Sequence, residues 1–343
     1  MSELEKLAEL IERQYRTSAV KLHMLANGWK KVYRIEHASQ PDWIVRAYPP
    51  PSDENLPVNI AALAAVLLFL EEQNYPAERV VRTTTGASVI QEEDWQLLMT
   101  TFVGQALTAW QPVAQANAPQ ITPSRENLGD DPKILFALGA ALGQLHALSP
   151  TSRLPLAGML PSRELGWAAT NLVTVAPQVP AHLQAQYQYL LTMTQNADRY
   201  EDLPFVLIHN DCNPSNAAIT PTGQIRLIDW ESAGRGPALI DVGILLSNCF
   251  SKQTMRIDQA AIMAVVDGYS QQRQLTEAEL ARLPDAIRFF RLVLLAGSFP
   301  DRVNQTLLDD ELIYGATYAQ WQAQHEASAE IAKIARTRFE SYL

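Results

Sequence analysis

The chain has 343 residues, of which 47% are hydrophobic and 19% are charged. This composition excludes an intrinsically disordered chain, and the length suggests two or three domains or one large two-lobed unit. The 27 Lys and Arg residues against 37 Asp and Glu residues give a formal net charge of −10, which argues against a binder of nucleic acid or of anionic membranes, because both ligands call for a basic surface.

The cysteines and the apolar runs of the sequence indicate the cellular compartment. Cys212 and Cys249 are far apart and form no CxxC pair, so neither a disulfide framework nor a cysteine zinc site is predicted. Residues 1–15 mix charged and apolar side chains at helical spacing and lack the apolar core of a signal peptide. The longest apolar run, residues 58–70, is too short to span a bilayer. We therefore expect a cytoplasmic protein with no membrane segment.

The N-terminal part of the chain predicts a small sheet that packs against a helix. After a first helix, residues 32–35 and 43–48 are rich in β-branched and aromatic residues and are expected to pair as a hairpin. Residues 58–70 follow as a buried helix, because they are apolar on all sides. Two further strands are expected near 89–90 and 95–101.

The rest of the chain is expected to be mainly helical. Residues 110–132 are rich in Pro, Gln, Asn and Ala without a period, which predicts a long surface excursion. Leucines recur at helical spacing over 135–145, and helical patterns continue from residue 250 almost to the end. The order of elements predicts an α/β (α+β) fold with a small sheet-bearing lobe over residues 1–103 and a larger, mainly helical lobe over 104–343.

Residues 205–241 carry the most informative pattern. A buried strand over 205–208 leads into His-Asn-Asp, which ends at Asp211, and Thr220-Pro221-Thr222-Gly223 is a strong turn signal between two short strands. By itself, H-x-D is more often a polar loop whose side chains cap the strand ends. The downstream Ile-Asp-Trp-Glu, in which Asp229 lies, favours a functional site instead.

The spacing within this segment brings three polar side chains together. A hairpin centred between the second and third residues of the turn would place Asn216 opposite Leu227. Asp229 would then lie two residues farther along the facing strand, about 7 Å away at ~3.4 Å per residue. Two carboxylates and a carboxamide at one strand end suit Mg²⁺. A carboxylate that does not bind the metal, such as that of Asp211, can accept a proton from a substrate hydroxyl.

The patterns H-N-D-x-x-x-x-N and I-D-W-E together resemble the catalytic and metal-binding loops of the aminoglycoside phosphotransferase and choline kinase-like family, a distant relative of the protein kinases. Residues 142–148 look like the family's helix before the catalytic loop. Residues 98–104 look like its linker between lobes, and residues 237–241 look like the element after the metal loop. The resemblance covers about residues 20–250 and implies a two-lobed protein-kinase-like fold.

This resemblance implies roles for individual residues of the larger lobe. Asp211 would be the catalytic base, or the group that orients the acceptor hydroxyl, and His209 would orient the catalytic loop. Asn216 and Asp229 would hold Mg²⁺ against the phosphates of ATP or GTP. Asp241 would brace the catalytic loop and take no part in the chemistry.

The resemblance also implies nucleotide contacts in the small lobe. Lys30 and Lys31 lie where the family has its nucleotide-covering hairpin, and they either contact phosphates or are surface lysines. Arg46 occupies the position of a cation that faces the phosphates, and arginine can bind phosphate oxygens in a bidentate manner. Thr100 and Phe102, in the linker, would contact the nucleotide.

Two departures from the family pattern keep a second interpretation open. The glutamate that would hold the cation at Arg46 is missing from the helix over 58–70, so Glu54, Glu71 or Glu72 substitutes for it, or Arg46 is held in another way. The phosphate-covering segment has a single glycine. The alternative is therefore a catalytically impaired kinase-like protein that serves as a nucleotide-binding or scaffold module.

The main interpretation is an ATP-dependent phosphotransferase that moves the γ-phosphate to a hydroxyl of a small molecule. The resemblance permits an aminoglycoside, an amino alcohol, homoserine or a sugar-like acceptor, chosen by the C-terminal helices and the 110–132 segment. Asp309, Asp310 and Glu311 are either an acidic patch for an amine-bearing acceptor or a solvated turn. Glu231 either reaches the substrate or a water molecule, or is a solvated loop residue.

Overall fold

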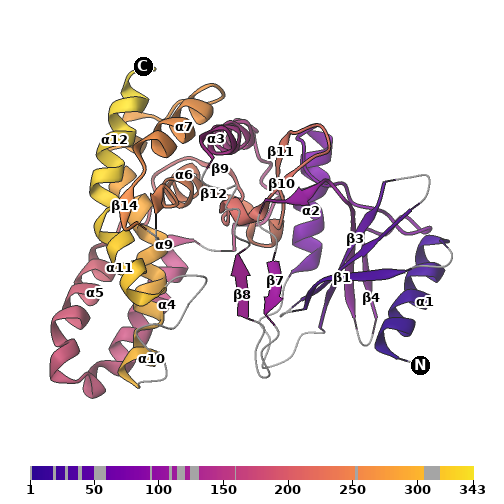
Figure 1. Cartoon of the computed structure of the whole chain (residues 1–343), viewed down its shortest axis with the longest axis horizontal. Coiled ribbons are helices and arrows are strands. Elements are labelled where there is room, and N and C mark those ends of the chain that lie inside the picture. Colours follow the sequence, from indigo (N-terminus) through magenta and orange to yellow (C-terminus); the bar gives the residue numbers. More distant parts are fainter. Residues whose placement is uncertain are drawn as a thin grey trace.

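A computed structural model of the chain describes residues 2–17, 21–27, 30–37, 41–49, 59–92, 95–107, 110–113, 120–123, 131–158, 160–251, 254–304 and 317–343. It is a two-lobed, mixed α/β structure with a small antiparallel sheet and many helices (Figure 1). Glu54 and the acidic residues 309–311 lie outside the described residues.

Five antiparallel strands form the sheet of the small lobe in the order β1-β2-β3-β5-β4. Their bounds are Leu22–Asn27 (β1), Lys31–Ile35 (β2), Trp43–Tyr48 (β3), Val89–Gln91 (β4) and Gln96–Thr101 (β5). The strands predicted from the sequence are confirmed. The sequence did not predict β1, because its residues Leu-His-Met-Leu-Ala-Asn lack the β-branched and aromatic side chains that favour strands.

The two faces of this sheet pack against different helices. Helix α1 (Glu3–Tyr15) covers one face, where Val45 is fully buried. Helix α2 (Ile60–Glu72) covers the other face, where its buried side chains and Tyr48 belong to one hydrophobic cluster. Figure 1 shows α2 between the sheet and the β10–β11 hairpin. Because side chains alternate along a strand, Arg46 shares the face of Tyr48 and points toward the large lobe.

The large lobe holds the remaining helices. They are α3 (Pro132–His146), α4 (Pro161–Val175), α5 (Gln184–Asn196), α6 (Ala238–Ser247), α7 (Gln259–Ser270), α8 (Glu277–Ala281), α9 (Leu283–Gly297), α10 (Phe299–Val303), α11 (Tyr318–Glu326) and α12 (Ser328–Glu340). Helix α9 lines two hydrophobic cores, one shared with α3, α6, α7 and α12 and the other with α4, α5, α10 and α11. No helix within the described ranges is long and apolar enough to cross a membrane.

Short strands connect these helices and position the polar loops. They are β6 (Gln105–Ala106), β7 (Trp110–Val113), β8 (Gln120–Pro123), β9 (Phe205–Ile208), β10 (Ala217–Ile219), β11 (Ile225–Leu227), β12 (Gly234–Pro237), β13 (Phe250–Ser251) and β14 (Arg256–Ile257). β9 pairs with β12, and β10 lies between β11 and β6. β7 pairs with β8, a hairpin that the aperiodic 110–132 segment did not predict, because each of its strands contains a proline, which argues against a strand.

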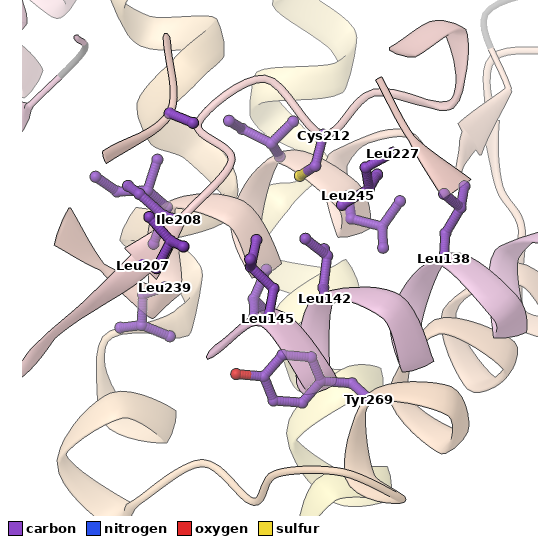
Figure 2. Packing of buried hydrophobic residues seen from close by; sticks show 14 of the residues in the cluster. Leu138, Leu142, Leu145, Leu207, Ile208, Cys212, Leu227, Leu239, Leu245 and Tyr269 are labelled. Atoms are coloured by element: carbon purple, nitrogen blue, oxygen red, sulfur yellow. The ribbon is translucent and has the colours of Figure 1, made fainter. Parts of the chain in front are cut away.

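A leucine-rich core lies beneath the polar loops (Figure 2). Leu138, Leu142 and Leu145 lie on one face of α3 and are fully buried in a cluster with Leu207 of β9. Their spacing of three and four residues is that of an amphipathic helix, and each buried leucine contributes about 1.5–3 kcal/mol. This packing fixes the direction in which β9 delivers the loop that follows it.

Backbone contact fixes the connection between the two lobes. After β5 the chain forms β6, in which Ala106 pairs with Ala218 of β10. A Cβ atom at Gly104 would lie 2.2 Å from the carbonyl oxygen of Ile219. Only glycine allows this approach, so the connection and the β10–β11 hairpin are held in one arrangement.

Candidate active site

One buried carboxylate organises the loop after β9. Asp241, in the first turn of α6 and fully buried, accepts hydrogen bonds from the backbone N–H groups of His209 and Asn210, both at 2.7 Å. His146 places its Nε2 3.0 Å from the same carboxylate and its Nδ1 3.0 Å from the hydroxyl of Tyr269. A buried charge is tolerated only with such donors, so Asp241 braces the loop as expected.

Asp211 lies in the braced loop with both carboxylate oxygens hydrogen-bonded. Asn213 donates to its Oδ1 at 2.5 Å, and Asn216 donates to its Oδ2 at 2.7 Å and to its carbonyl oxygen at 2.9 Å. Burial raises the pKa of Asp211, although His209 and the two amides oppose that rise. A half-buried carboxylate with a raised pKa is suited to accept a proton from a bound hydroxyl.

The register of the β10–β11 hairpin differs by one residue from the expected one. Ile228, and not Leu227, lies opposite Asn216, and the N–H of Ile228 donates to the carbonyl oxygen of Asn216 at 2.9 Å. The reason is a three-residue loop that ends at Gly223 in the left-handed conformation, with φ 79°. Asp229 therefore follows directly after the residue that faces Asn216, closer than the sequence predicted.

Asp229 is held in a left-handed backbone conformation, which is uncommon for residues other than glycine. Its φ of 71° and ψ of 58° lie in the left-handed region, which Asp adopts more readily than most other residues. Its Oδ1 forms an ion pair with the ammonium of Lys30, which also contacts Glu231 Oε1. Burial and the nearby Glu231 raise the pKa of Asp229, whereas its side chain remains 38% exposed to solvent. Burial alone would lower the pKa of Lys30, but the negative charges of Glu231 and Asp229 outweigh this effect and raise that pKa.

Glu231 links the loop after β11 to the sheet of the small lobe. Its Oε1 accepts hydrogen bonds from Tyr48 Oη at 2.7 Å and from Lys30 Nζ, and it lies 3.5 Å from Arg46 Nε. Burial opposes ionisation of Glu231, yet the charges of Lys30 and Arg46 lower its pKa. The side chain is 10% exposed, so the interpretation as a solvated loop residue is wrong.

Arg46 is held by an acid that the sequence did not indicate. Glu78, which follows the end of α2, accepts a hydrogen bond from Nη1 of Arg46 at 2.9 Å and another from Nη2 at 2.8 Å. Arg46 and Glu78 are 6% and 2% exposed, which makes this a buried bidentate ion pair. Glu71 and Glu72 are exposed at the end of α2. Neither of these helix glutamates holds Arg46, and Glu78 does so instead.

The other predicted nucleotide contacts have local partners. The hydroxyl of Thr100 is fully buried and donates to the Glu78 carboxylate at 2.5 Å. Phe102 lies under the guanidinium of Arg34, with 4.5 Å from its ring centroid to Arg34 Cζ. Lys31 points toward α1 and donates to a carboxylate there at 2.6 Å. Contact of these residues with a nucleotide stays a prediction.

The oxygen atoms of this site fit the chemistry of magnesium. Asn216 offers a carboxamide oxygen and Asp229 a carboxylate, beside the carboxylate of Asp211, and hard oxygen ligands of this kind suit Mg²⁺. Within the described ranges, no group of three His, Cys, Asp or Glu side chains is placed to hold a metal ion. Mg²⁺ takes one or two protein carboxylates and completes its shell with water and phosphate oxygens, so the donor set is compatible with it.

Sequence reasoning missed four residues that shape the site. Glu78 holds Arg46 within the small lobe and Tyr48 donates to Glu231 of the large lobe, whereas Asn213 and Tyr269 act within the large lobe. Asn213 lies within the catalytic pattern and was detectable as an additional amide beside Asp211. The other three become neighbours of the site only through tertiary packing, for which the sequence carries no local signal.

The paired lobes and the polar loops between them define a kinase-like protein. The chain belongs to the phosphotransferase enzyme family, whose model matches residues 21–283. An uncharacterised protein of Deinococcus radiodurans is 26% identical over 161 residues, which is 46% of each chain, so this chain spans about half the length of the curated relative that it matches.

Two solved structures share the fold at low sequence identity. An amicoumacin kinase in complex with AMP-PNP and Ca²⁺ has a TM-score of 0.63 at 15% identity, over 99% of this chain and 94% of that one. A spectinomycin phosphotransferase in complex with ADP and spectinomycin has a TM-score of 0.60 at 13% identity, over 97% of this chain and 98% of that one. At these identities the similarity concerns the fold.

Proposed function

We propose that this protein transfers the γ-phosphate of ATP to a hydroxyl of a small molecule. One observation carries the proposal. Asp211 is hydrogen-bonded to Asn216, whose backbone pairs with Ile228 directly before Asp229. A proton acceptor and two oxygen donors for a metal are thereby joined at one end of a hairpin. Enzymes of phosphoryl transfer work mainly by such positioning, together with electrostatic stabilisation.

The nucleotide would lie between the lobes, which we propose to divide between residues 103 and 104. Asn216 and Asp229 would hold Mg²⁺, which neutralises charge on the phosphates. Arg46, fixed by Glu78, would present its remaining donor surface to the phosphates. AMP-PNP with Ca²⁺ in the amicoumacin kinase, and ADP in the spectinomycin phosphotransferase, support a nucleotide and a divalent cation here.

Asp211 would accept the proton of the acceptor hydroxyl as its oxygen forms a bond to the γ-phosphorus. The bond between that phosphorus and the bridging oxygen of ADP breaks, and ADP leaves with the electron pair. The products are a phosphate monoester, ADP and a proton that Asp211 passes to water. Asn213 and Asn216 fix the carboxylate during this step, and Asp241 holds the loop that carries it.

A thermal-stability experiment with nucleotide tests the donor site. The melting temperature of the wild type would be measured with MgATP, with MgGTP and with Mg²⁺ alone, beside Asp229→Ala and the control Glu330→Ala, an exposed residue of α12. A ligand at 100 times its Kd adds about 2.7 kcal/mol, which corresponds to a shift of several degrees. We expect the shift in the wild type and in Glu330→Ala, and its loss in Asp229→Ala.

Asp211→Ala separates chemistry from binding. This variant is expected to keep the shift with MgATP and to lose phosphoryl transfer, because the carboxylate is needed for the hydroxyl proton and not for the nucleotide. Full turnover by Asp211→Ala would overturn its role as the base. A flat thermal response of the wild type at millimolar nucleotide would instead favour the scaffold alternative, although Glu78 now fills the role of the glutamate whose absence motivated it.

A further inference from the structure

Among the described residues, a buried arginine of the large lobe has no acidic partner. Arg291 lies on α9 and is 2% exposed. Across the described parts of the chain, no carboxylate forms an ion pair with its guanidinium, and its Nε is buried without a hydrogen-bond acceptor. Its Cζ lies 4.2 Å from the ring centroid of Trp321 on α11 and 5.0 Å from that of Phe290. Two aromatic rings therefore lie beside a cation for which the described residues supply no counter-ion.

Among the described residues, the other buried arginine does have an acid. Arg46 is paired with Glu78, and Arg273 donates to the buried Glu279 at 2.7 Å. An isolated charge in a protein interior is expensive, and a cation–π contact offsets only part of that cost. The missing acid at Arg291 therefore points to a counter-ion that is brought by a ligand.

The position of Arg291 connects it with the acceptor side of the candidate active site. Burial lowers its pKa to about 9, so it stays protonated at neutral pH, and Asp211 is the acid whose charge counteracts that lowering. Asp211 is also the residue that we propose to activate the acceptor hydroxyl. Contacts of α11 lead to the same residue: Trp321, whose ring faces Arg291, lies one turn before Gln324, which donates to the carbonyl oxygen of Ser247 at the end of α6. The neighbouring Asn248 donates to Asn213, which in turn donates to Asp211, so a chain of contacts connects Arg291 with the acceptor-side carboxylate.

We propose that Arg291 binds an anionic group of the acceptor, a carboxylate or a phosphate carried by the molecule whose hydroxyl Asp211 activates. The proposal rests on the phosphotransferase function above and names its substrate class. A guanidinium presents a planar fork of N–H donors that matches the two oxygens of a carboxylate or phosphate. Hydroxy acids and phosphorylated polyols fit this requirement, whereas a polycationic acceptor would place like charges beside Arg291.

The test compares acceptors that differ in charge. The full-length protein with Mg²⁺ and AMP-PNP would be titrated by calorimetry with L-homoserine and D-glycerate as carboxylates and with glycerol 3-phosphate as a phosphate. Glycerol, ethanolamine and kanamycin are the neutral and cationic counterparts, and transfer from MgATP would be measured for all six. We expect binding and turnover with the carboxylate compounds or with the phosphate compound. Comparison of these two groups identifies which anionic group Arg291 binds. Equal or better binding and turnover of the uncharged or cationic compounds, or no binding of any anionic one, would overturn the proposal.

Substitutions then assign the binding to the arginine. Arg291→Met is expected to raise the Kd of the anionic acceptor about 10- to 100-fold, the range for loss of a charge-assisted hydrogen bond. The Kd of AMP-PNP should be unchanged. Arg291→Lys keeps the charge without the fork and is expected to restore part of the affinity. The matched control is Arg302→Met, an arginine of α10 that stacks on Tyr318, which should leave acceptor affinity unchanged.

Stability without acceptor distinguishes a binding residue from a structural one. Because an unpaired buried charge destabilises the fold, Arg291→Met should unfold in urea at the same or a higher midpoint than the wild type. A lower midpoint combined with unchanged acceptor affinity would mean that Arg291 supports the structure alone. If MgATP did not shift the melting temperature of the wild type, the phosphotransferase function itself would be refuted. If the nucleotide bound normally but the preferred acceptor were neutral or cationic, only the role of Arg291 would be refuted.

Discussion

Replacing Glu78 by alanine tests the central ion pair of the small lobe. Glu78 receives two hydrogen bonds from Arg46, at 2.8 and 2.9 Å, and a third from Thr100 at 2.5 Å. All three side chains are buried. The substitution therefore leaves a guanidinium in the protein interior without its main counter-ion, in the strand that we propose to face the nucleotide phosphates.

The expected loss of stability follows from this geometry. Removing one partner of a buried ion pair costs about 3–5 kcal/mol, because the remaining charge is uncompensated. Glu231 remains 3.5 Å from Arg46 Nε and neutralises part of that charge, so we expect the lower end, about 3 kcal/mol. Replacing Glu78 and Arg46 together by methionine should cost much less, because it removes both charges.

Urea unfolding of the wild type, Glu78→Ala, Arg46→Met and the double methionine variant provides the measurement, with MgATP binding followed by thermal shift. Glu78→Ala should lower both the unfolding free energy and nucleotide affinity, whereas the double variant should recover stability without recovering affinity. A loss below about 1 kcal/mol in Glu78→Ala, typical of an exposed pair, would refute the assignment of a buried and essential pair.

Four further changes probe the brace, the link between the lobes, their connection and the response to pH. Asp241→Asn leaves at least one buried backbone N–H with a poorer acceptor and should cost about 2–3 kcal/mol in urea unfolding; an unchanged midpoint would contradict the brace. Tyr48→Phe removes the bond to Glu231 and should cost about 1 kcal/mol; no loss would mean that this bond does not form in solution. Gly104→Ala introduces a Cβ atom 2.2 Å from a carbonyl oxygen and should lower the melting temperature and weaken MgATP binding, and wild-type values for both would argue against close contact at the connection. Burial and the nearby Arg288 lower the pKa of His325 to about 4, so the unfolded chain binds more protons between pH 6.5 and 4, and stability should fall by about 3 kcal/mol as pH decreases through this window. His325→Gln should flatten that decrease, and an equally steep decrease in the variant would assign the pH response to other groups.

Local patterns predicted those parts of the fold whose stability is local. The strands β2 and β3 were predictable because β-branched and aromatic residues favour an extended chain. The leucine face of α3 was predictable because its spacing matches the helical period. By contrast, β1 forms because β2 offers it an edge, and its own residues do not favour a strand.

The candidate site was predictable in its chain order but not in its cross-chain contacts. Asp211, Asn216 and Asp229 lie close in sequence on one hairpin, so a turn signal was enough to bring them together. The register was wrong by one residue because turn length decides it, and Gly223 allows a three-residue loop. The pairing of Arg46 with Glu78 depends on how α2 and β3 pack, which no spacing in the sequence reports.

The charges that meet between the lobes support the proposal of a divalent cation and a nucleotide at this site. Lys30 and Arg46 face the carboxylates of Glu78, Asp229 and Glu231, so two cations are set against three anions when all are ionised. A bound divalent cation would reverse this excess and favour anionic phosphates beside it. Because Lys30 already contacts Asp229, its ammonium would exchange one anionic partner for another as the nucleotide enters, while Glu78 keeps Arg46 in place. The small lobe would thereby respond to the nucleotide through charge, with its hydrophobic cores undisturbed.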